Sequence, residues 1–450
     1  MLIIVPAGLH ASGVVMWATR LASALADRGR PAGLLLHGRA EGPLAEEISP
    51  SVRVFEHPGL PHFDVLGGEL AGVIPVYAAA VGAMAGAAGA DGPVVVSPNL
   101  HGDCYGAVAA LTMVAPERVR VLGWAHSDNR YDVRVLGHFE SVLHRVVGVS
   151  AVLRDRLAEA LPMRVEDVVH IPYGVRVDGP DATEKEPVHD RPLRLVYTGR
   201  IEEEQKRASA LVWMSRALTA WGVRYELRVL GDGVARAGLE AESTGDTAIA
   251  WHGAVSPEGV RASLRWADAF VLPSRYEGLS VSMLEAMACG CTPVVARVRS
   301  GAAEAVEDGV SGLLVDVDGD ALAQETGEAF AETLAGVDCA RLAGMGAAAA
   351  RRAAALFGIE RHADAGEAVI DAAAGSLGRS WPASRAVAFQ GACVGLGGTP
   401  ADAAGRMRGA LAGLRGKRVG IHGTGRHSRE LASVFAACSG ASEAAEIVAF

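Results

Sequence analysis

Short apolar runs alternate with longer helical stretches along most of this chain. Four runs of strand length stand in its first part, at residues 2–5, 33–36, 93–97 and 119–124. Each is followed by a polar or glycine-containing turn, which is typical of buried parallel strands. The same alternation begins again at Leu193 and continues to Val295. Two such sets of strand, turn and helix predict an α/β fold with two doubly wound domains.

The domain boundaries follow from length and from one change in composition. A chain of 450 residues, half of them hydrophobic, is too long for a single core, because one core stops growing at about 250–300 residues. Residues 177–192 are mostly polar and charged and contain no aromatic side chain, which is typical of a linker. We therefore expect a first Rossmann-like domain at residues 1–178 and a second at residues 179–370.

The last part of the chain does not complete a domain of its own. Residues 371–415 carry mixed loop signals and are expected to form a linker region. Residues 416–450 predict a strand, a glycine turn, a helix and a second strand. Such a unit cannot bury both faces of its sheet. We therefore expect a partial Rossmann-like fragment, either truncated or completed by a partner.

Charge and cysteine content argue against several classes of protein. The net charge is −10, whereas a nucleic-acid-binding protein normally carries a basic field. Six scattered cysteines do not form a disulfide framework and favour a reducing compartment. The first residues lack the basic segment of a signal peptide, and the apolar stretch around residues 76–90 is too short to span a bilayer. We expect a cytoplasmic protein without a transmembrane segment, of unknown oligomeric state.

The segment SRYEGLSVSMLEAMACGCTPVV, residues 274–295, joins a strand to a helix through a Glu–Gly turn. The helix is expected to start near residues 279–280 and to end at Gly290, a C-terminal cap. The first amides of a helix have no partner within it, so the amides of Gly278, Leu279 and Ser280 can bind an anion. The segment therefore predicts a diphosphate-binding turn at the carboxyl edge of a sheet.

Two carboxylates belong to this segment, Glu277 in the turn and Glu285 on the helix. The two acids of a glycosidase must face each other across a cleft, whereas these two lie on one turn and its own helix. Separate roles fit better, with Glu277 toward a sugar and Glu285 toward the hydroxyls of a ribose. The alternative is that Glu277 only forms the turn and that Glu285 is a solvated helix residue.

A second charged cluster, TGRIEEEQKR at residues 198–207, directly follows a predicted strand. Arg200 and Lys206 suit a diphosphate, Arg by two parallel hydrogen bonds and Lys as a point charge. They would also stabilise the charge that develops on a phosphate leaving group. The alternative is simple ion pairing with the three glutamates of the same loop, Glu202, Glu203 and Glu204.

Five segments occur in an order and spacing that resemble a known family. They are TGRIEEEQKR, LGDG at residues 230–233, WHGAVS at 251–256, YEGLSVSMLEAMACGCTPVV and DGVSGLLV at 308–315. Together they resemble the carboxyl-terminal domain of the family 4 retaining nucleotide-sugar glycosyltransferases (glycosyltransferase group 1). The resemblance covers roughly residues 1–370. It implies the GT-B fold, in which two Rossmann-like domains face each other.

The resemblance also implies roles for the residues of the second domain, which would bind the donor. Arg200 and Lys206 would hold the donor diphosphate and assist its departure, and Glu277 would contact the transferred sugar. Glu285 would bind the ribose. The remaining donor contacts would come from Gly278, Leu279 and Ser280 at the phosphates or sugar and from Gly253 and Val255 near the base.

The first domain would lie on the acceptor side and is less similar to the family. His126, followed by Asp128, occupies the position of a cleft-facing histidine and is a candidate catalytic residue. The family usually has a Gly–Gly turn before the first helix, where this chain has Ser12 and Gly13. Gly13 can keep the turn and its contact with the donor, whereas Ser12 departs from the family pattern.

The implied activity is transfer of a sugar from a nucleoside-diphosphate sugar to a hydroxyl or other nucleophile of an acceptor, with retention of configuration. The resemblance implies no metal and no cofactor besides the nucleotide-sugar co-substrate. The departing phosphate would accept the proton of the acceptor on the same face of the sugar. The donor sugar, its base and the acceptor stay open.

Two other functions remain as alternatives. The sequence Gly423-Thr424-Gly425, followed by Ser428, is a loose form of a dinucleotide-binding fingerprint, so one alternative is an NAD-type enzyme centred on this turn. The other is a module that binds a nucleotide sugar without turnover. Cys289 and Cys291 have no second pair of ligands nearby in the sequence, so we interpret them as structural rather than metal-binding.

Overall fold

The computed structural model describes residues 1–9, 12–39, 47–60, 70–87, 92–99, 101–177, 191–389, 419–421 and 447–449. The chain divides into two compact units, Met1–Ala392 and Cys393–Phe450. In the second unit, strands β14 (Val419–Ile421) and β15 (Ile447–Ala449) pair in parallel. The glycine turn at Gly423 and most of the predicted linker at 177–192 lie outside the described residues.

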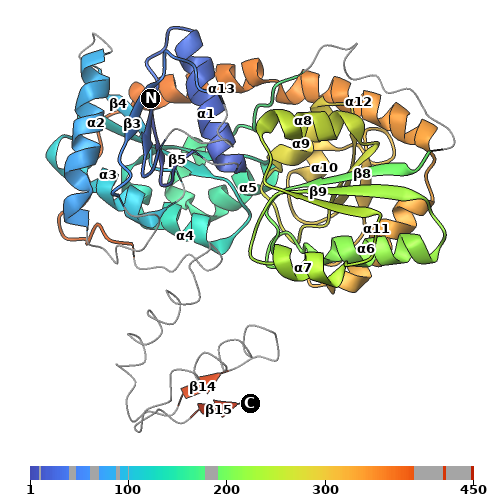
Figure 1. Ribbon diagram of the computed structural model, residues 1–450. Coiled ribbons are helices and arrows are strands. Elements are labelled where there is room, and N and C mark those ends of the chain that lie inside the picture. Colours follow the sequence, from blue (N-terminus) through green and yellow to red (C-terminus); the bar gives the residue numbers. More distant parts are fainter. Residues whose placement is uncertain are drawn as a thin grey trace. The chain divides into compact units, whose positions relative to one another are not determined.

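The first unit contains two parallel sheets, each flanked by helices (Figure 1). The first sheet has the strand order β3-β2-β1-β4-β5-β6-β7. Its strands are β1 Leu2–Val5, β2 Gly33–Leu36, β3 Arg53–Glu56, β4 Val94–Ser97, β5 Val119–Ala125, β6 Leu143–Gly148 and β7 Val168–His170. Its α-helices are α1 Gly13–Asp27, α2 Ile74–Ala87, α3 Gly102–Val114, α4 Arg130–His138 and α5 Ala151–Ala160, with short 3-10 turns at Leu70–Gly72, Glu140–Val142 and Pro162–Asp167.

The second sheet has the order β10-β9-β8-β11-β12-β13. Its strands are β8 Leu193–Thr198, β9 Tyr225–Leu230, β10 Ile249–Gly253, β11 Ala269–Leu272, β12 Thr292–Ala296 and β13 Leu313–Val315. Its helices are α6 Ser209–Ala220, α7 Arg236–Glu242, α8 Pro257–Trp266, α9 Val281–Ala288, α10 Ala302–Ala305, α11 Ala323–Ala335 and α12 Cys339–Phe357. The predicted doubly wound α/β class is confirmed.

The sequence pattern explains why the buried strands were predicted and why the edge strand β3 was not. β1, β2, β4 and β5 are buried at every residue, as continuous apolar runs in a parallel sheet should be. β3, with the sequence RVFE, lies at the edge of the sheet and has no fully buried residue. Because the strand begins with Arg53 and ends with Glu56, it does not form a continuous apolar run and was not predicted.

In each sheet there is one pair of neighbouring strands at which the strand order reverses: the chain leaves one of the two strands toward one edge of the sheet and the other strand toward the opposite edge. In the first sheet this switch point lies between β1 and β4, and in the second it lies between β8 and β11. Loops at such a point diverge and leave a crevice at the carboxyl ends of the strands, where α/β proteins bind ligands. The loops after β8 and β11 carry Lys206 and Glu277, respectively.

The last helix of the first unit, α13 (Ile359–Ala374), packs on the first sheet, although the sequence predicted that it belongs to the second domain. It lies against α1 and against β4, β5 and β6 of the first sheet (Figure 1). The prediction assigned residues 359–370 to the second domain. The buried face of α13, which includes His362, Val369 and Ile370, instead completes the cover of the first sheet.

The chain after α13 continues along the first sheet as far as it is described. Trp381 is 1 % exposed. Its ring lies 5.1 Å from the ring of Phe139, and its amide donates to Thr112 Oγ1 at 3.0 Å. The predicted linker at 371–415 therefore begins, up to residue 389, as a packed part of the first unit. Among the described residues, no helix is both long and apolar enough to cross a membrane.

His362 ties α13 to the chain that it covers. Its Nε2 accepts a hydrogen bond from the indole N–H of Trp17 at 3.1 Å, so its Nδ1 carries the proton and donates to the carbonyl of Pro172 at 2.7 Å. The side chain is 3 % exposed, and this burial lowers the pKa of His362 to about 4. The imidazole is therefore neutral at physiological pH.

We predict that His362→Gln weakens the pH dependence of stability below pH 6.5. The folded-state pKa of about 4 lies below the unfolded value, so the unfolded state binds more protons between these two pH values. Stability is therefore lost as the pH falls, by about 1.4 kcal/mol per pH unit for this residue. Urea denaturation at pH 7.5 and 5.0 measures the effect, with the exposed His252→Gln as control. Equal pH dependence in wild type and His362→Gln would contradict it.

Candidate functional site

Two glutamates of the loop after β8 accept hydrogen bonds that hold the loop in its conformation. The side chain of Glu202 accepts hydrogen bonds from the backbone amides of Gln205, at 3.1 Å, and Lys206, at 3.0 Å. The hydroxyl of Tyr197, on β8, donates to the carbonyl of Arg200 at 2.6 Å. Glu203 accepts from the amide and hydroxyl of Ser209 at the start of α6. Glu202 and Glu203 therefore stabilise the backbone of the loop, while the side chain of Lys206 points toward Glu277.

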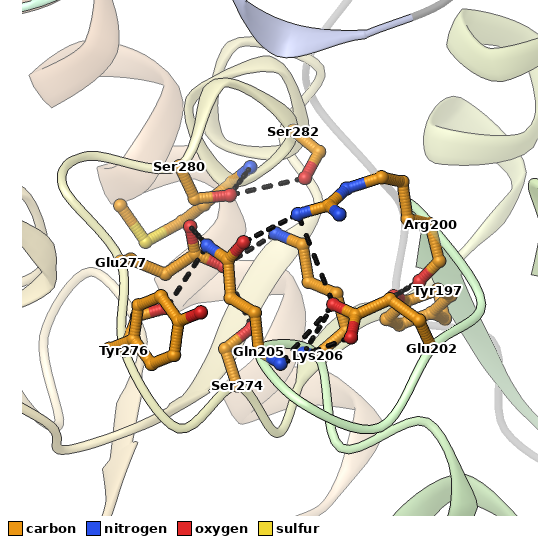
Figure 2. Close-up of polar contacts among 11 residues, drawn as sticks. Tyr197, Arg200, Glu202, Gln205, Lys206, Ser274, Tyr276, Glu277, Ser280 and Ser282 are labelled. Atoms are coloured by element: carbon orange, nitrogen blue, oxygen red, sulfur yellow. Dashed lines mark hydrogen bonds and ion pairs between the residues drawn. The ribbon is translucent and has the colours of Figure 1, made fainter. Parts of the chain in front are cut away.

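The carboxylate of Glu277, in the turn after β11, accepts hydrogen bonds from three side chains (Figure 2). Its Oε1 accepts from Lys206 Nζ at 2.5 Å and from Ser274 Oγ at 2.8 Å, and its Oε2 accepts from Gln205 Nε2 at 3.2 Å. The side chains of Lys206 and Glu277 are 12 % and 11 % exposed. The structure thus joins the two charged clusters of the sequence in one partly buried ion pair.

Arg200 lies next to this pair and is more open to solvent. Its Nη2 donates to Gln205 Oε1 at 2.5 Å and lies 3.9 Å from Glu202 Oε1. Its side chain is 43 % exposed, so it can still turn toward an anion. Gln205 joins Arg200 to Glu277 and was not singled out in the sequence, because an amide in a charged loop gives no pattern of its own.

Helix α9 begins at Val281, slightly later than expected. Ser280 is the N-cap and accepts from the amide of Met283 at 3.3 Å. Gly278 and Leu279 therefore belong to the turn before the helix. A small pocket opens beside this turn. Its polar lining consists of Ser274, Glu277, Ser280 and Ser300.

Gly278 touches the first sheet. A Cβ atom on this residue would lie 2.2 Å from the carbonyl oxygen of His126, so only glycine fits there. His126 follows β5, the strand next to β4. Gly13, at the start of α1, similarly faces Val281, because its Cβ would lie 3.4 Å from Val281 Cγ2. The starts of α1 and α9 are therefore neighbours.

Ser12 has a structural reason to replace the family glycine. It is the N-cap of α1, and its Oγ accepts from the amide of Val15 at 3.3 Å. Serine is a preferred N-cap residue. His10 and Ala11, which precede it, lie outside the described residues.

Glu285 forms an ion pair with Arg20, a residue of the first domain. Its Oε1 lies 2.5 Å from Nη2 of Arg20, which belongs to α1, and the two side chains are 11 % and 10 % exposed. The alternative of a solvated helix residue is therefore wrong. No sequence pattern pointed to Arg20, because it stands in an ordinary helix of the other domain.

His126 lies in an aromatic cluster with Trp17, Trp124 and Tyr173. Its Nδ1 lies 2.6 Å from the hydroxyl of Tyr173, whereas its Nε2 is buried without a hydrogen-bond partner. Burial lowers the pKa of His126 to about 3. The ring is therefore neutral and has one nitrogen available for a hydrogen bond.

The other candidate residues lie at the edges of this site. Asp128 pairs with Arg156 and Arg299. Gly253 ends β10 and has φ 71°, and its carbonyl accepts from the amide of Gly231 at 2.7 Å. Val255 follows it and is half-buried. β9 separates β10 from β8, so the structure does not bring Gly253 and Val255 into contact with the Lys206–Glu277 pair.

Cys289 and Cys291 are both fully buried at the end of α9. Among the described residues, no group of three or more His, Cys, Asp or Glu side chains is arranged to hold a metal ion.

Comparisons with known proteins point to one class. Residues 192–332 match a family model described as glycosyl transferases group 1. A putative colanic acid biosynthesis glycosyltransferase, WcaL of Salmonella typhimurium, is 37 % identical over 148 residues, which are 30 % of this chain and 36 % of that protein. An alpha-D-kanosaminyltransferase of Streptomyces kanamyceticus is 34 % identical over 130 residues, 28 % of this chain and 33 % of that one. These alignments span about a third of the length of the curated relatives.

Solved structures resemble a larger part of the chain. HepE of Anabaena, in complex with UDP, covers 82 % of this chain and 99 % of its own at 15 % identity, with a TM-score of 0.57. Sucrose-phosphate synthase of Thermosynechococcus elongatus covers 83 % of this chain and 99 % of its own at 20 % identity, with a TM-score of 0.62. The fold is GT-B, as predicted. Within it, residues 192–332, which match the group 1 glycosyltransferase model, contain the second sheet.

We predict that Arg20 and Glu285 are coupled in stability. Arg20→Met removes the cation that this partly buried carboxylate contacts, and Glu285→Met removes the carboxylate from Arg20. Breaking a buried ion pair on one side costs about 3–5 kcal/mol, and the double variant should lose clearly less than the sum of the two. Chemical denaturation of the four proteins measures this coupling.

The matched control for this cycle is the exposed pair Arg154–Asp155, whose side chains are 42 % and 63 % exposed. Exposed pairs contribute about 0–1 kcal/mol, so its cycle should show little coupling. Additive losses for Arg20→Met and Glu285→Met would mean that the pair does not stabilise the protein.

Proposed function

We propose that this chain is a retaining glycosyltransferase that transfers a sugar from a nucleoside-diphosphate sugar to a hydroxyl group of an acceptor. The observation that carries the proposal is the Lys206–Glu277 pair at the switch point of the second sheet, with Arg200 beside it. This arrangement puts two cations and a carboxylate at the edge where α/β domains bind nucleotides. The match of residues 192–332 to group 1 glycosyltransferases supports it.

The two cations suit the leaving diphosphate. Arg200, which is partly exposed, can form two hydrogen bonds to phosphate oxygens, and Lys206 adds a point charge. The N-terminus of α9 adds amides and the positive end of a helix dipole. As the bond between the sugar and the phosphate breaks, negative charge grows on the diphosphate. The cations stabilise that charge and need no metal ion for it.

The two glutamates have different tasks. Glu277 is held in place by Lys206, Ser274 and Gln205 and lines the pocket next to α9, where it can accept hydrogen bonds from the hydroxyls of the transferred sugar. Glu285 binds the ribose. A carboxylate has several lone pairs, so Glu285 can keep Arg20 on Oε1 and accept a ribose hydroxyl as well.

In a transfer that retains the configuration of the anomeric carbon, the acceptor attacks from the face that the diphosphate leaves. The bond from the anomeric carbon to the diphosphate breaks, and a bond to the acceptor oxygen forms on the same face. The proton of the acceptor hydroxyl moves to the departing phosphate oxygen, which balances the charge. His126, neutral and with Nε2 available, would hydrogen-bond the sugar from the first domain. Gly13 would approach the phosphates, and Gly253 and Val255 would lie near the base.

We predict that a nucleoside diphosphate raises the melting temperature of the protein and that NAD does not. A ligand that binds only the folded state stabilises it by about 2.7 kcal/mol at a hundred times its Kd. The panel is UDP, GDP, ADP, dTDP and NAD. UDP is the first choice, because it is bound in the related fold of HepE. Stabilisation by NAD alone would move the site to the carboxyl-terminal fragment and overturn the proposal.

We further predict that Glu277→Ala lowers sugar transfer by roughly 10²–10³-fold but changes nucleotide binding little. Glu285→Ala should instead weaken nucleotide binding itself. Calorimetric titration with the nucleotide and a transfer assay separate the two effects. Glu204→Ala, an exposed glutamate of the loop after β8, is the control. Wild-type transfer rates in Glu277→Ala would contradict the assigned role, and nucleotide binding without any turnover in wild type would favour a binding module.

A further inference from the structure

Arg207, the residue after Lys206, has two features that the site described above does not explain. Its side chain is 0 % exposed, although arginine is seldom fully buried. Its φ of 51° lies in the left-handed region, where residues other than glycine are uncommon. Both features are costly, and strained backbone of this kind is concentrated at functional sites.

The guanidinium group of Arg207 binds the connection between β13 and α11. Its Nη2 donates to the carbonyl oxygens of Gly319, at 2.6 Å, and Asp318, at 3.3 Å. Its Nη1 donates to Thr326 Oγ1, on α11, at 2.6 Å. The hydroxyl of Thr326 donates in turn to the carbonyl of Leu322 at 3.0 Å. The end of the loop after β8 is therefore fastened to α11 and to residues 318–321, which we call the carbonyl turn.

The buried guanidinium group stays charged at physiological pH. Burial lowers the pKa of Arg207 to about 10, and the neighbouring Arg275 contributes to this shift. A buried charge is costly unless it is hydrogen-bonded. Glycine would adopt the same φ without strain and without a buried charge. The contacts with the carbonyl turn and α11 are therefore what arginine adds at this position.

The other loop of the site is fastened to the same carbonyl turn. Arg275, two residues before Glu277, donates from Nη1 to the carbonyl oxygens of Gly319 and Ala321, both at 3.2 Å. Its amide donates to the carbonyl of Gln205 at 2.7 Å. The carbonyl of Gly319 therefore accepts from both arginines, and the loops after β8 and β11 share one support.

The backbone is also fixed on both sides of Arg207. The amide of Lys206 donates to Glu202 Oε1 at 3.0 Å, and the carbonyl of Arg207 accepts from the amide of Ala210 in α6 at 3.0 Å. Between these two hydrogen bonds, the left-handed bend at residue 207 sets the direction in which the side chain of Lys206 leaves the loop. That side chain extends to Glu277 (Figure 2).

We propose that Arg207 is a positioning residue for Lys206. Its guanidinium group, bound to the carbonyl turn and α11, keeps residue 207 in the left-handed conformation and so holds Lys206 Nζ at the edge where the donor diphosphate would bind. Arg207 itself contacts no ligand in this role. The inference rests on the proposed function for the ligand that it names, whereas the effect of Arg207 on the Lys206–Glu277 pair depends on no ligand.

The first test measures the Lys206–Glu277 pair without ligand. Chemical denaturation gives the coupling between Lys206→Met and Glu277→Gln in unfolding free energy, once with Arg207 and once with Arg207→Gly. Glycine permits the left-handed bend but does not hold it, so Arg207→Gly should reduce the coupling. Equal coupling in the two backgrounds would overturn the positioning role.

A second, milder variant covers the case in which Arg207→Gly does not fold. Thr326→Val keeps the shape of a fully buried side chain and removes the acceptor of Arg207 Nη1. It should also reduce the coupling between Lys206 and Glu277, by less than Arg207→Gly does. Unchanged coupling in Thr326→Val would contradict the assigned role of the guanidinium contacts.

The second test measures nucleotide affinity by calorimetric titration with UDP, or with whichever nucleoside diphosphate of the panel stabilises the protein. Arg207→Gly should weaken binding about tenfold. Combined with Lys206→Met, it should weaken binding little further, because Arg207 acts through Lys206. Fully additive losses in the double variant would mean that Arg207 acts by another route and would overturn the inference.

The matched control is Arg120→Met. Arg120 is 6 % exposed, and its guanidinium group also donates to carbonyl oxygens, those of Ser376 and Pro116, both at 2.9 Å. It lies near the amino end of β5, away from the candidate site. Arg120→Met should lower stability and leave nucleotide affinity unchanged. A loss of affinity equal to that in Arg207→Gly would show a general effect of stability and contradict the positioning role.

These measurements separate the inference from the proposed function. If Arg207→Gly reduces the coupling of Lys206 with Glu277 but wild type binds no nucleoside diphosphate, Arg207 positions Lys206 and the proposed function fails. If wild type binds the nucleotide and Arg207→Gly binds it equally well, the proposed function stands and the positioning role fails.

Discussion

The ion pair between Lys206 and Glu277 is the interaction on which the candidate site depends. It joins the loops after β8 and β11, which are neighbouring strands at the switch point of the second sheet. Because the two side chains are about one-tenth exposed, the pair is costly to break on one side. Gln205 and Ser274 complete the hydrogen bonds of the carboxylate. A carboxylate and a lysine held in place, with the more exposed Arg200 beside them, suit a site for a charged leaving group.

The first domain contributes through close contacts rather than through charge clusters of its own. The lack of a side chain on Gly278 lets the turn of Glu277 meet the backbone of His126, and Gly13 at the start of α1 faces Val281 at the start of α9. Arg20 then reaches Glu285 from α1. These contacts join the loops of the second sheet to the carboxyl edge of the first, where Ser97 and Asn99 lie buried with atoms that have no partner.

Particular elements show how far sequence reasoning reached. Continuous apolar runs predicted β1, β2, β4 and β5 correctly, because a strand buried on both faces has to be apolar throughout. The edge strand β3 was missed for the converse reason. Helix α13 was assigned to the wrong neighbour, since an amphipathic pattern shows that a helix has a buried face but not which sheet covers it. The packed segment around Trp381 was hidden by its loop-like composition.

The sequence by itself determined the α/β class and the two charged clusters, because strand periodicity, caps and motif spacing are local properties of the chain. It also determined which glutamates and cations to consider. Only the tertiary structure decided that Lys206 bonds Glu277, that Arg20 bonds Glu285, and that Ser97 and Asn99 lie buried at the edge of the first sheet. These are contacts between residues far apart in the chain, and the order of strands in a sheet decides which loops meet. No local pattern of residues encodes that order.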